Sequence, residues 1–245
     1  KIINLVDQTD KVKTEQFRTS FLSVVAHELR TPLTVLMNYI SLLHNEESGS
    51  GGSAEIVEDM RKTCGDLRRR VKNIIDVANI SVSSYPLSAD TCELKTMMEQ
   101  IVSEFREQIE SKNCTPSIES SEPALTVVTD KNLLSLAIKG VISNAIKFNR
   151  QDGDVRMRFE QKENKGKRNL FISIEDQGEG IPQQTKKYLY ESFIQGENPL
   201  IRKYSGMGTG LYLVRRAIDI LNGTIEVFSR EGNGTRFVIS VPVQE

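Results

Sequence analysis

The sequence predicts a two-part protein in which a pair of long helices precedes an α/β sandwich. Apolar residues recur every three or four positions through most of residues 11–78, which indicates amphipathic helices. A Ser- and Gly-rich run at residues 48–53 interrupts this pattern, and alternating strand-like segments begin only after residue 84. The expected fold class is therefore an antiparallel helical hairpin that dimerises into a four-helix bundle, followed by an α/β sandwich.

Composition places the chain among soluble globular proteins and excludes several other classes. Its 245 residues are 38% hydrophobic and 27% charged, with a net charge of −1. This balance gives no positive field for nucleic acid or an anionic membrane, and no apolar run reaches the roughly 18 residues of a spanning helix. The three cysteines are widely spaced and form no CxxC motif. They favour reduced thiols in the cytoplasm over a disulfide framework or a cysteine metal site.

The helices of the hairpin are expected over residues 11–44 and 56–78. Apolar positions in the first are Phe17, Phe21, Val24 or Val25, Leu29, Leu33, Leu36, Ile40 and Leu43. In the second they are Ile56, Met60, Cys64, Leu67, Val71, Ile74, Ile75 and Ala78. Pro32 should kink the first helix, because proline lacks an amide donor and crowds the preceding turn. A single hairpin buries too little apolar surface to be stable, so two copies are expected to pair.

The second part follows a linker at residues 84–90 and mixes helices with strands. Helices are expected over residues 94–110 and 130–148, and after residue 210. Strands are expected over residues 125–128, 155–160, 170–175, 224–228 and 235–241, with glycines marking the last hairpin. This order predicts helices packed on one face of a mixed sheet.

Three segments of the second part could bind a ligand. The run DQGEG at residues 176–180 follows a strand; Asp176 could accept a hydrogen bond from an amine, although an ordinary turn uses the same residues. The run GMGTG at residues 206–210 opens into a helix and could hold phosphate, although it is not a Walker loop. Asn144 and Lys147 share a helix face and could hold Mg²⁺ and phosphate, or simply be solvated.

A fourth segment lies in the first helix. The run HELRTPL at residues 27–33 places a histidine shortly before a proline. A histidine on a helix is usually structural or merely exposed. Here the neighbouring Glu28 could orient the imidazole or accept its proton, which would make His27 a better nucleophile.

Taken in order, these segments resemble the sensor histidine kinases of two-component signalling. Residues 27–33 are similar to that family's phosphoacceptor box, and the helix ending at residues 144–148 is similar to its N box. The other resemblances are the first glycine box at 176–180, the F box at 191–193, the second glycine box at 206–213 and the terminal strand motif at 232–237. The resemblance covers nearly the whole chain.

The resemblance implies a domain order and a reaction. Residues 11–83 would form the dimerisation and histidine-phosphotransfer domain, and residues 84–245 a catalytic ATP-binding domain of the Bergerat fold. His27 would take the γ-phosphoryl group of ATP, with Glu28 as proton acceptor, and pass it to an aspartate of a response-regulator receiver domain. Thr31 would orient water if the protein also dephosphorylates that partner.

The same resemblance implies a nucleotide site that uses ATP with Mg²⁺. Asn144 would bind the Mg²⁺, Lys147 a phosphate, and Asp176 the adenine amine. The other cofactor-binding positions would be Gly178 and Gly180 near the adenine, Phe193 as the packing anchor of a mobile lid over residues 183–205, and Gly206, Gly208, Gly210 and Leu211 around the triphosphate.

Two positions depart from the family pattern. Gly140 stands one turn before Asn144, where the N box usually has an asparagine. The change removes a polar contact near the metal and predicts weak ATP affinity or slow autophosphorylation. Gln177 replaces a more usual asparagine in the first glycine box, a smaller change. A weakly active or degenerate core that acts mainly as a phosphatase or signalling partner is therefore an alternative.

Residues 1–10 add an expectation about the parent protein. The run Asp7-Gln8-Thr9 resembles the exit from a PAS sensor domain, so the chain is expected to be a core with a sensor domain upstream. This core is expected to be cytoplasmic even where the parent protein is anchored in a membrane. A further alternative is a gyrase-type or chaperone-type ATPase of the same fold, in which the histidine run would have no role.

Overall fold

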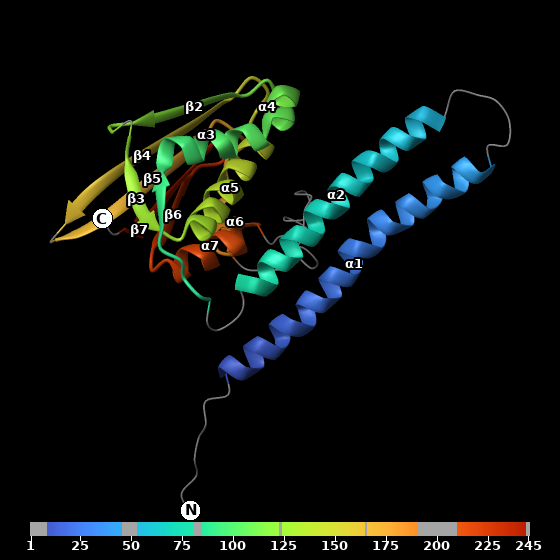
Figure 1. Ribbon diagram of the computed structural model, residues 1–245, viewed down its shortest axis with the longest axis horizontal. Coiled ribbons are helices and arrows are strands. Elements are labelled where there is room, and N and C mark those ends of the chain that lie inside the picture. The colour runs from blue at the N-terminus through green and yellow to red at the C-terminus, as the bar shows by residue number, and fades with distance from the viewer. Residues whose placement is uncertain are drawn as a thin grey trace, which may run out of the picture. The chain divides into compact units, whose positions relative to one another are not determined.

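The computed structural model describes residues 9–45, 53–80, 85–122, 124–164, 166–190 and 210–243 (Figure 1). The chain divides into two compact units, with the division between Ala78 and Asn79. The first unit holds two helices and the second holds all the strands. The linker expected over residues 1–10 lies outside the described residues except for the start of the first helix.

The first unit is built from α1 (Thr9–Asn45) and α2 (Ser53–Ile80), which run in opposite directions (Figure 1). The hairpin predicted from the apolar spacing is therefore present. Pro32 lies inside α1, yet the helix continues unbroken on both sides of it. A single proline removes only one amide donor from a helix of 37 residues, so the helix can extend past it.

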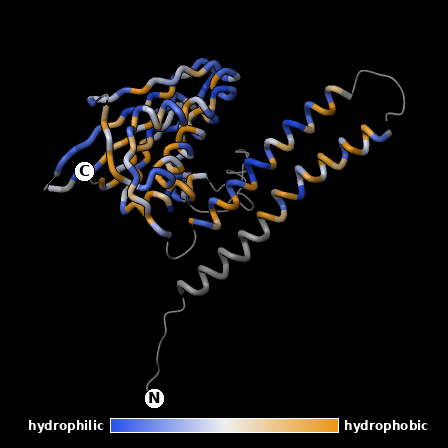
Figure 2. Tube along the Cα trace, in the orientation of Figure 1, coloured by the Kyte–Doolittle hydropathy of each residue, from blue (hydrophilic) through white to orange (hydrophobic). Residues whose placement is uncertain are grey.

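Most large apolar residues of the hairpin fall on two adjacent stripes that differ in burial, while Val35 and Leu42 are exposed on another side of α1. The covered stripe is wholly or partly buried and comprises Val25, Leu29, Pro32, Leu36, Tyr39 and Leu43 of α1 with Ile56, Met60, Leu67, Ile74 and Val77 of α2. The exposed stripe comprises Leu33, Met37 and Ile40 of α1 with Val57, Val71 and Ile75 of α2. Figure 2 shows hydrophobic positions recurring along both helices. One helix–helix contact thus uses only part of the apolar surface.

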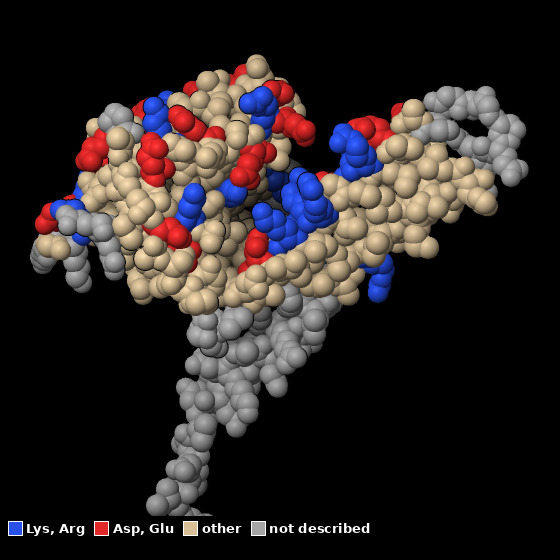
Figure 3. All heavy atoms as spheres, viewed as in Figure 1, with Lys and Arg blue, Asp and Glu red and all other residues tan. Residues whose placement is uncertain are grey.

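The polar surface of α2 carries a concentration of positive charge. Lys and Arg side chains gather over this helix (Figure 3), where Arg68, Arg69, Arg70 and Lys72 follow one another closely. Arg61 pairs with Glu58 at 2.8 Å and Arg69 with Asp66 at 2.5 Å, both three residues apart along the helix. These exposed pairs keep this face of α2 solvated.

The second unit contains twelve described helices and strands. In chain order they are β1 (Asp90–Glu93), α3 (Leu94–Glu104), α4 (Arg106–Lys112), β2 (Thr115–Ser120), β3 (Thr126–Thr129), α5 (Lys131–Lys147), β4 (Asp154–Asn164), β5 (Lys167–Asp176), α6 (Gln183–Lys186), α7 (Gly210–Ile220), β6 (Thr224–Ser229) and β7 (Thr235–Pro242).

Five of the strands form a mixed sheet in the order β2-β4-β5-β7-β6. The β2–β4 pair is parallel and the other three pairs are antiparallel. β1 and β3 form a separate antiparallel pair. Helices α3, α5 and α7 lie on one face of the sheet (Figure 1), so the predicted α/β sandwich with a mixed sheet is confirmed. In this register Asp176, the last residue of β5, lies opposite Val155 and Thr235.

The structure differs from the sequence prediction at three places. β1 and β2 were not predicted as strands, and Asp90 of β1 was assigned to the linker. β1 has only four residues, and β2 contains Pro116 and a single large aliphatic side chain, so neither carries a clear alternating pattern. The helix expected over residues 94–110 is split at Phe105, whose φ of −101° and ψ of 12° leave the helical range.

The core of the sandwich is formed where α5 and α7 pack against the sheet. Its fully buried side chains include Leu134, Ile138 and Ile142 of α5, Met157 and Phe159 of β4, Ile172 of β5, Val214 of α7 and Ile239 of β7. Burying large aliphatic side chains contributes roughly 1.5–3 kcal/mol each. This core therefore fixes α5, which carries the candidate N box, against the strand that ends at Asp176.

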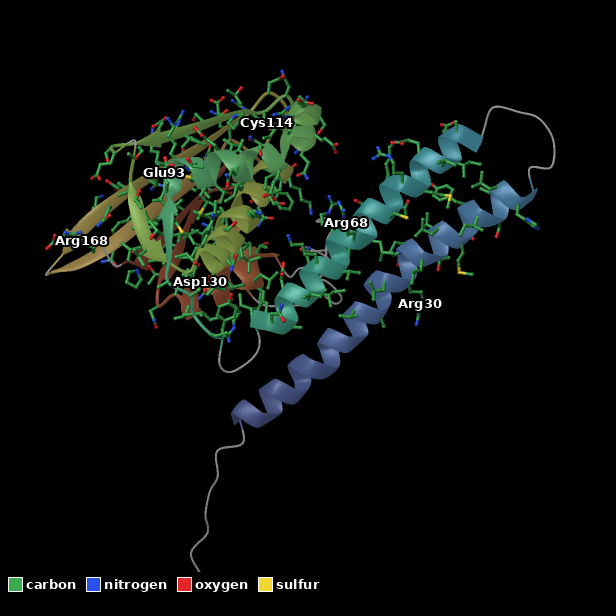
Figure 4. All side chains as sticks on the ribbon, in the orientation of Figure 1. Arg30, Arg68, Glu93, Cys114, Asp130 and Arg168 are labelled. Atoms are coloured by element: carbon green, nitrogen blue, oxygen red, sulfur yellow. The ribbon has the colours of Figure 1, made fainter. Side chains whose placement is uncertain are left out.

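Asp130 begins α5 and also ties it to the preceding segment (labelled in Figure 4). Its Oδ1 accepts hydrogen bonds from the amides of Asn132 and Leu133, at 3.1 and 3.0 Å. Its Oδ2 accepts the amide of Ser88 at 3.0 Å. The buried carboxylate thus caps α5 and also joins this helix to the segment at Ser88.

The three cysteines are free thiols in this structure. Cys92 and Cys114 are buried in the second unit, and Cys64 is exposed on α2. None of the described helices is long and apolar enough to span a bilayer.

Candidate nucleotide-binding site

Asp176 is the central polar group of the candidate site. It is only 7% exposed, and its Oδ1 accepts the amides of Gly178 at 2.9 Å and Thr235 at 3.2 Å. Within the described part of the chain its Oδ2 makes no hydrogen bond, so this oxygen is available to a donor from a ligand. Burial raises the pKa of Asp176 from 3.8 to about 6, although the two amides favour the ionised form.

Asn144 and Lys147 lie one turn apart near the end of α5. The Asn144 side chain is half-buried, and that of Lys147 is exposed with its Nζ 4.9 Å from the centroid of the Phe148 ring. Partial desolvation of the ammonium lowers the pKa of Lys147 from its ordinary value of 10.5. An amide oxygen and an ammonium therefore share the last turns of this helix, as expected from their spacing.

Hydrogen bonds join the end of α5 to the turn that follows Asp176. The amide of Glu179 donates to the carbonyl of Phe148 at 3.4 Å. The amide of Gln177 donates to Oδ1 of Asn149 at 3.2 Å, and Nδ2 of Asn149 donates to the carbonyl of Asp154 at 3.1 Å. The candidate adenine-binding residue and the candidate metal-binding helix are thus held in one frame.

Lys112 supports the same helix end from α4. Its Nζ donates to the carbonyls of Lys147 at 2.5 Å and Asn149 at 2.9 Å. A cation at the C-terminal end of a helix also interacts favourably with the helix dipole. Sequence reasoning missed both Lys112 and Asn149, because the contacts join residues about 30 positions apart. The only sequence signal was a basic residue in the last turn of a helix.

Gly178 and Gly180 are required by contacts within the protein itself. A Cβ at Gly178 would lie 2.0 Å from the carbonyl oxygen of Phe148. A Cβ at Gly180, whose φ is +70°, would lie 2.1 Å from the carbonyl oxygen of Arg230. We expected these glycines to admit a ligand. Their first structural role is to let this turn pack against two neighbouring backbone segments.

Both ends of the Gln177 side-chain amide form hydrogen bonds. Its Oε1 accepts Nη2 of Arg150 at 2.8 Å and the amide of Asp154 at 3.3 Å, while its Nε2 donates to Oδ2 of Asp154 at 3.2 Å. The side chain thus bridges the turn to the start of β4. The Gln177 amide therefore has hydrogen-bond partners for both its oxygen and its nitrogen.

The other expected nucleotide contacts are only partly described. Gly210 begins α7 and is exposed, and Leu211 next to it is half-buried. Phe193, Gly206 and Gly208 lie outside the described residues, as does the lid sequence after residue 190. Of the expected lid, the structure describes the short α6 and the turn that follows it. Lys186 of α6 donates a hydrogen bond to the carbonyl of Ser229.

The candidate phosphoacceptor lies on α1 in the first unit. His27 is exposed, and Oγ1 of Thr31 donates to the carbonyl of His27 at 3.3 Å. At 100° per residue, both lie on the side of α1 away from the covered stripe. Glu28 is helical and adjacent to His27, and its side chain lies outside the description. An exposed imidazole is accessible to a phosphoryl donor.

Two family models match this chain. Residues 17–81 match the His Kinase A (phospho-acceptor) domain, and residues 129–245 match the histidine kinase-, DNA gyrase B- and HSP90-like ATPase domain. The first match contains His27 and Thr31. The second contains Asn144, Asp176 and Gly210. Each candidate residue therefore falls in the domain that its proposed chemistry requires.

Curated relatives match along nearly the full length of the chain. It is 26% identical over 227 residues to sensor histidine kinase AtsR of Burkholderia thailandensis, covering 93% of this chain and 37% of that protein. It is 29% identical to the autoinducer 2 sensor kinase/phosphatase LuxQ of Vibrio harveyi, covering 95% and 27%. It is 28% identical to sensor protein kinase WalK of Staphylococcus saprophyticus, covering 98% of this chain and 39% of that protein. The chain thus spans well under half the length of these relatives.

Solved structures share the fold. The histidine kinase AdeS of Acinetobacter baumannii matches with a TM-score of 0.69 at 20% identity, covering 89% of this chain and 98% of that one. ShkA in complex with AMPPNP matches with a TM-score of 0.67 at 21% identity, covering 91% and 45%. ThkA in complex with the response regulator protein TrrA matches with a TM-score of 0.68 at 20% identity, covering 99% and 69%.

Proposed function

We propose that this chain, which belongs to the sensor histidine kinases of two-component signalling, transfers the γ-phosphoryl group of ATP to His27. The group would then pass to an aspartate of a response-regulator receiver domain. The observation that carries the proposal is the buried Asp176, whose Oδ2 has no partner within the described residues, fixed beside the helix end that bears Asn144 and Lys147. An exposed histidine in a matched phospho-acceptor domain supplies the acceptor.

The nucleotide would be held at its two ends by different elements. Oδ2 of Asp176 would accept the adenine amine, and Lys147 would approach a phosphate. Among the described residues, no cluster of three or more His, Cys, Asp or Glu could hold a metal ion. Asn144 can supply one oxygen ligand to Mg²⁺, which would take its other ligands from phosphate and water. When bound, Mg²⁺ would neutralise charge on the phosphates.

The transfer itself needs few protein groups. A nitrogen of the His27 imidazole attacks the γ-phosphorus, an N–P bond forms, and the bond to the bridging oxygen breaks so that ADP leaves with the electron pair. Glu28 accepts the imidazole proton. In the second step the receiver aspartate attacks the same phosphorus and His27 leaves. Positioning and charge neutralisation supply most of the catalysis in such transfers.

The working form of the protein would be a homodimer formed through the hairpin. The exposed stripe on α1 and α2 presents large apolar side chains, with Met37 68% and Ile40 55% exposed. A second hairpin would cover these residues and complete a four-helix bundle. The matched phospho-acceptor domain supports this pairing. We also propose a sensor domain upstream of this core. The core would lie in the cytoplasm, where ATP and reduced thiols are found.

Thr31 supports a second activity on the same partner. Its hydroxyl is exposed one turn from His27, and its Oγ1 bonds the His27 carbonyl, which leaves the oxygen's lone pairs available to orient water. Dephosphorylation of the response regulator would use this group. A clamp-type ATPase of the same fold is disfavoured, because it gives no role to the phospho-acceptor domain matched at residues 17–81.

The test is phosphorylation of the purified chain with γ-labelled ATP and Mg²⁺. The wild type should acquire an acid-labile, base-stable label, and His27→Gln should lose it while still binding nucleotide. The matched control is His44→Gln, the other histidine of the chain, which is also exposed on α1 and should keep the label. Label retained by His27→Gln, or nucleotide binding without any label in the wild type, would overturn the proposal.

A further inference from the structure

Gly140 lies in the contact between α5 and α7. These helices lie side by side on the sheet (Figure 1), and Gly140 is one turn before Asn144 on α5. A Cβ added at Gly140 would lie 2.4 Å from Cγ2 of Val214 and 3.6 Å from the carbonyl oxygen of Gly210. A contact of 2.4 Å is far inside van der Waals distance, so any side chain at this position must displace something.

Val214 has little freedom to move away. It is 0% exposed and lies in the interior of α7. A β-branched side chain in a helix strongly prefers one rotamer, and close-packed neighbours remove the alternatives. A side chain at residue 140 would therefore push the backbone of α7 away from α5. Gly210 and Leu211, at the start of α7, would move with it.

We propose that Gly140 and Val214 are a matched pair that positions the start of α7 against the helix bearing Asn144. This inference rests on the proposed function, because Asn144 and Gly210 are two of its nucleotide contacts. The glycine is then a positioning residue rather than a lost asparagine. An asparagine restored at residue 140 alone does not fit opposite Val214, so Gly140→Asn weakens nucleotide binding instead of improving it.

The structure also identifies the compensating change. If Val214 is shortened to alanine, the nearest remaining atoms to a Cβ at residue 140 are the Gly210 carbonyl oxygen at 3.6 Å and Cβ of residue 214 at 3.9 Å. Both are ordinary contact distances. Gly140→Ala should therefore be tolerated when Val214→Ala accompanies it, although each change alone is harmful.

The test is a double-mutant cycle on the full chain with Gly140→Ala, Val214→Ala and both together. Binding of a fluorescent ATP analogue with Mg²⁺ and the melting temperature are measured for each protein. Gly140→Ala should weaken binding by about tenfold and lower the melting temperature. The double variant should recover both quantities to near the wild-type values, with a sign reversal in the effect of each mutation.

The matched control is Leu134→Ala, which removes a fully buried side chain ten residues before Asn144 on the same helix. It should lower the melting temperature without changing the affinity of the folded protein. Additive losses in the double variant would overturn the pairing. Unchanged affinity in Gly140→Ala, with a lowered melting temperature, would overturn the positioning role. A wild type that binds no nucleotide would instead refute the proposed function, and the melting temperatures would still test the pairing.

Discussion

The two units of this chain differ in how completely they bury their own apolar side chains. The sandwich buries the large side chains of its helices and strands within itself, and residues such as Leu134, Phe159 and Ile172 are almost completely covered. The hairpin leaves an entire stripe uncovered, including Met37 and Ile40. A unit with its own core can be stable alone, whereas two helices with an uncovered stripe call for a partner surface.

This difference also separates the two halves of the proposed chemistry. The sandwich needs a rigid frame, because Asp176 and Asn144 lie on different elements that must keep their spacing. The hairpin presents His27 on an exposed helix face, which the proposed transfer from a nucleotide to a receiver domain would require. In the proposed reaction, the packed sandwich would hold the nucleotide and the exposed helix face would accept and pass on the phosphoryl group.

The largest effect is expected from charge placed in the exposed stripe. Met37→Glu combined with Ile40→Glu should convert the proposed dimer to a monomer, because two carboxylates from each copy would be buried in the bundle without partners. Light scattering should show the mass halved. Leu42→Glu is the matched control, since Leu42 is equally exposed but lies on the opposite side of α1 and should leave the mass unchanged. A dimer that survives the double change would show that another surface joins the two copies.

Loss of core volume should affect the sandwich alone. Leu134→Ala removes a fully buried side chain and should lower the free energy of unfolding of this unit by about 2–5 kcal/mol. Chemical denaturation followed by probes in each unit measures the two transitions separately. The hairpin transition should not shift. A shift of both transitions by the same amount would show that the units unfold together.

Replacing Asp176 with asparagine should raise the stability of the sandwich while lowering its affinity for ATP. The folded-state pKa of about 6 lies above the ordinary 3.8, so the folded form holds an extra proton between these values. The extra proton stabilises the folded state fully below pH 3.8, and this stabilisation is lost as the pH rises through about 6. Above that pH the free energy of unfolding is lower by up to about 3 kcal/mol. Asp176→Asn removes this cost and keeps an Oδ1 that accepts the amides of Gly178 and Thr235.

We therefore expect Asp176→Asn to melt higher than the wild type at pH 7.5, with a smaller difference at pH 4. Its affinity for ATP should fall, because an Oδ1 that keeps the amides of Gly178 and Thr235 places Nδ2, a donor, where Oδ2 would accept the adenine amine. Thermal melts across pH 4–8 and nucleotide titrations measure both effects. A variant less stable than the wild type at pH 7.5 would contradict the assignment of a costly buried carboxylate.

The smallest effect is expected at the start of α5. Asp130→Ala should destabilise the sandwich by about 1–2 kcal/mol, because the cap bonds to Asn132 and Leu133 and the bond to Ser88 are lost together. Asp130→Asn is the control that keeps the accepting oxygen of a cap and should recover much of the loss. The measurement is the unfolding free energy of this unit. Equal losses in both variants would assign the effect to charge instead of capping.

The sequence predicted the hairpin but not the division of its apolar surface. Leu33 and Leu36 both fit a spacing of three and four residues, yet one is exposed and the other is half-buried. Periodicity shows that a helix is amphipathic. It does not show which neighbour covers each part of a wide apolar face, because that depends on the helix it meets.

The candidate site was predicted where its residues stand at the ends of helices and strands. Asp176 and Asn144 were predicted as candidates from their positions in the sequence and from the family resemblance, and their roles stay predictions. Lys112, Asn149 and Val214 were not found, since their importance arises from contacts with distant parts of the chain. The strands β1 and β2 were missed for a different reason, because short strands with few aliphatic residues carry no alternation.

The hydrogen bonds around Asp176 have a consequence for the order of folding. They join residues 28 positions apart at Asn149 and Gln177, and 59 apart at Asp176 and Thr235. Such contacts form only after long loops have closed, so the site is expected to appear late, with the assembled sheet. The amides of Gly178 and Thr235 should then exchange hydrogen with solvent only when the whole sandwich opens. Bound nucleotide should slow that exchange in proportion to its occupancy, so that the protection of two amides reports the saturation of the site.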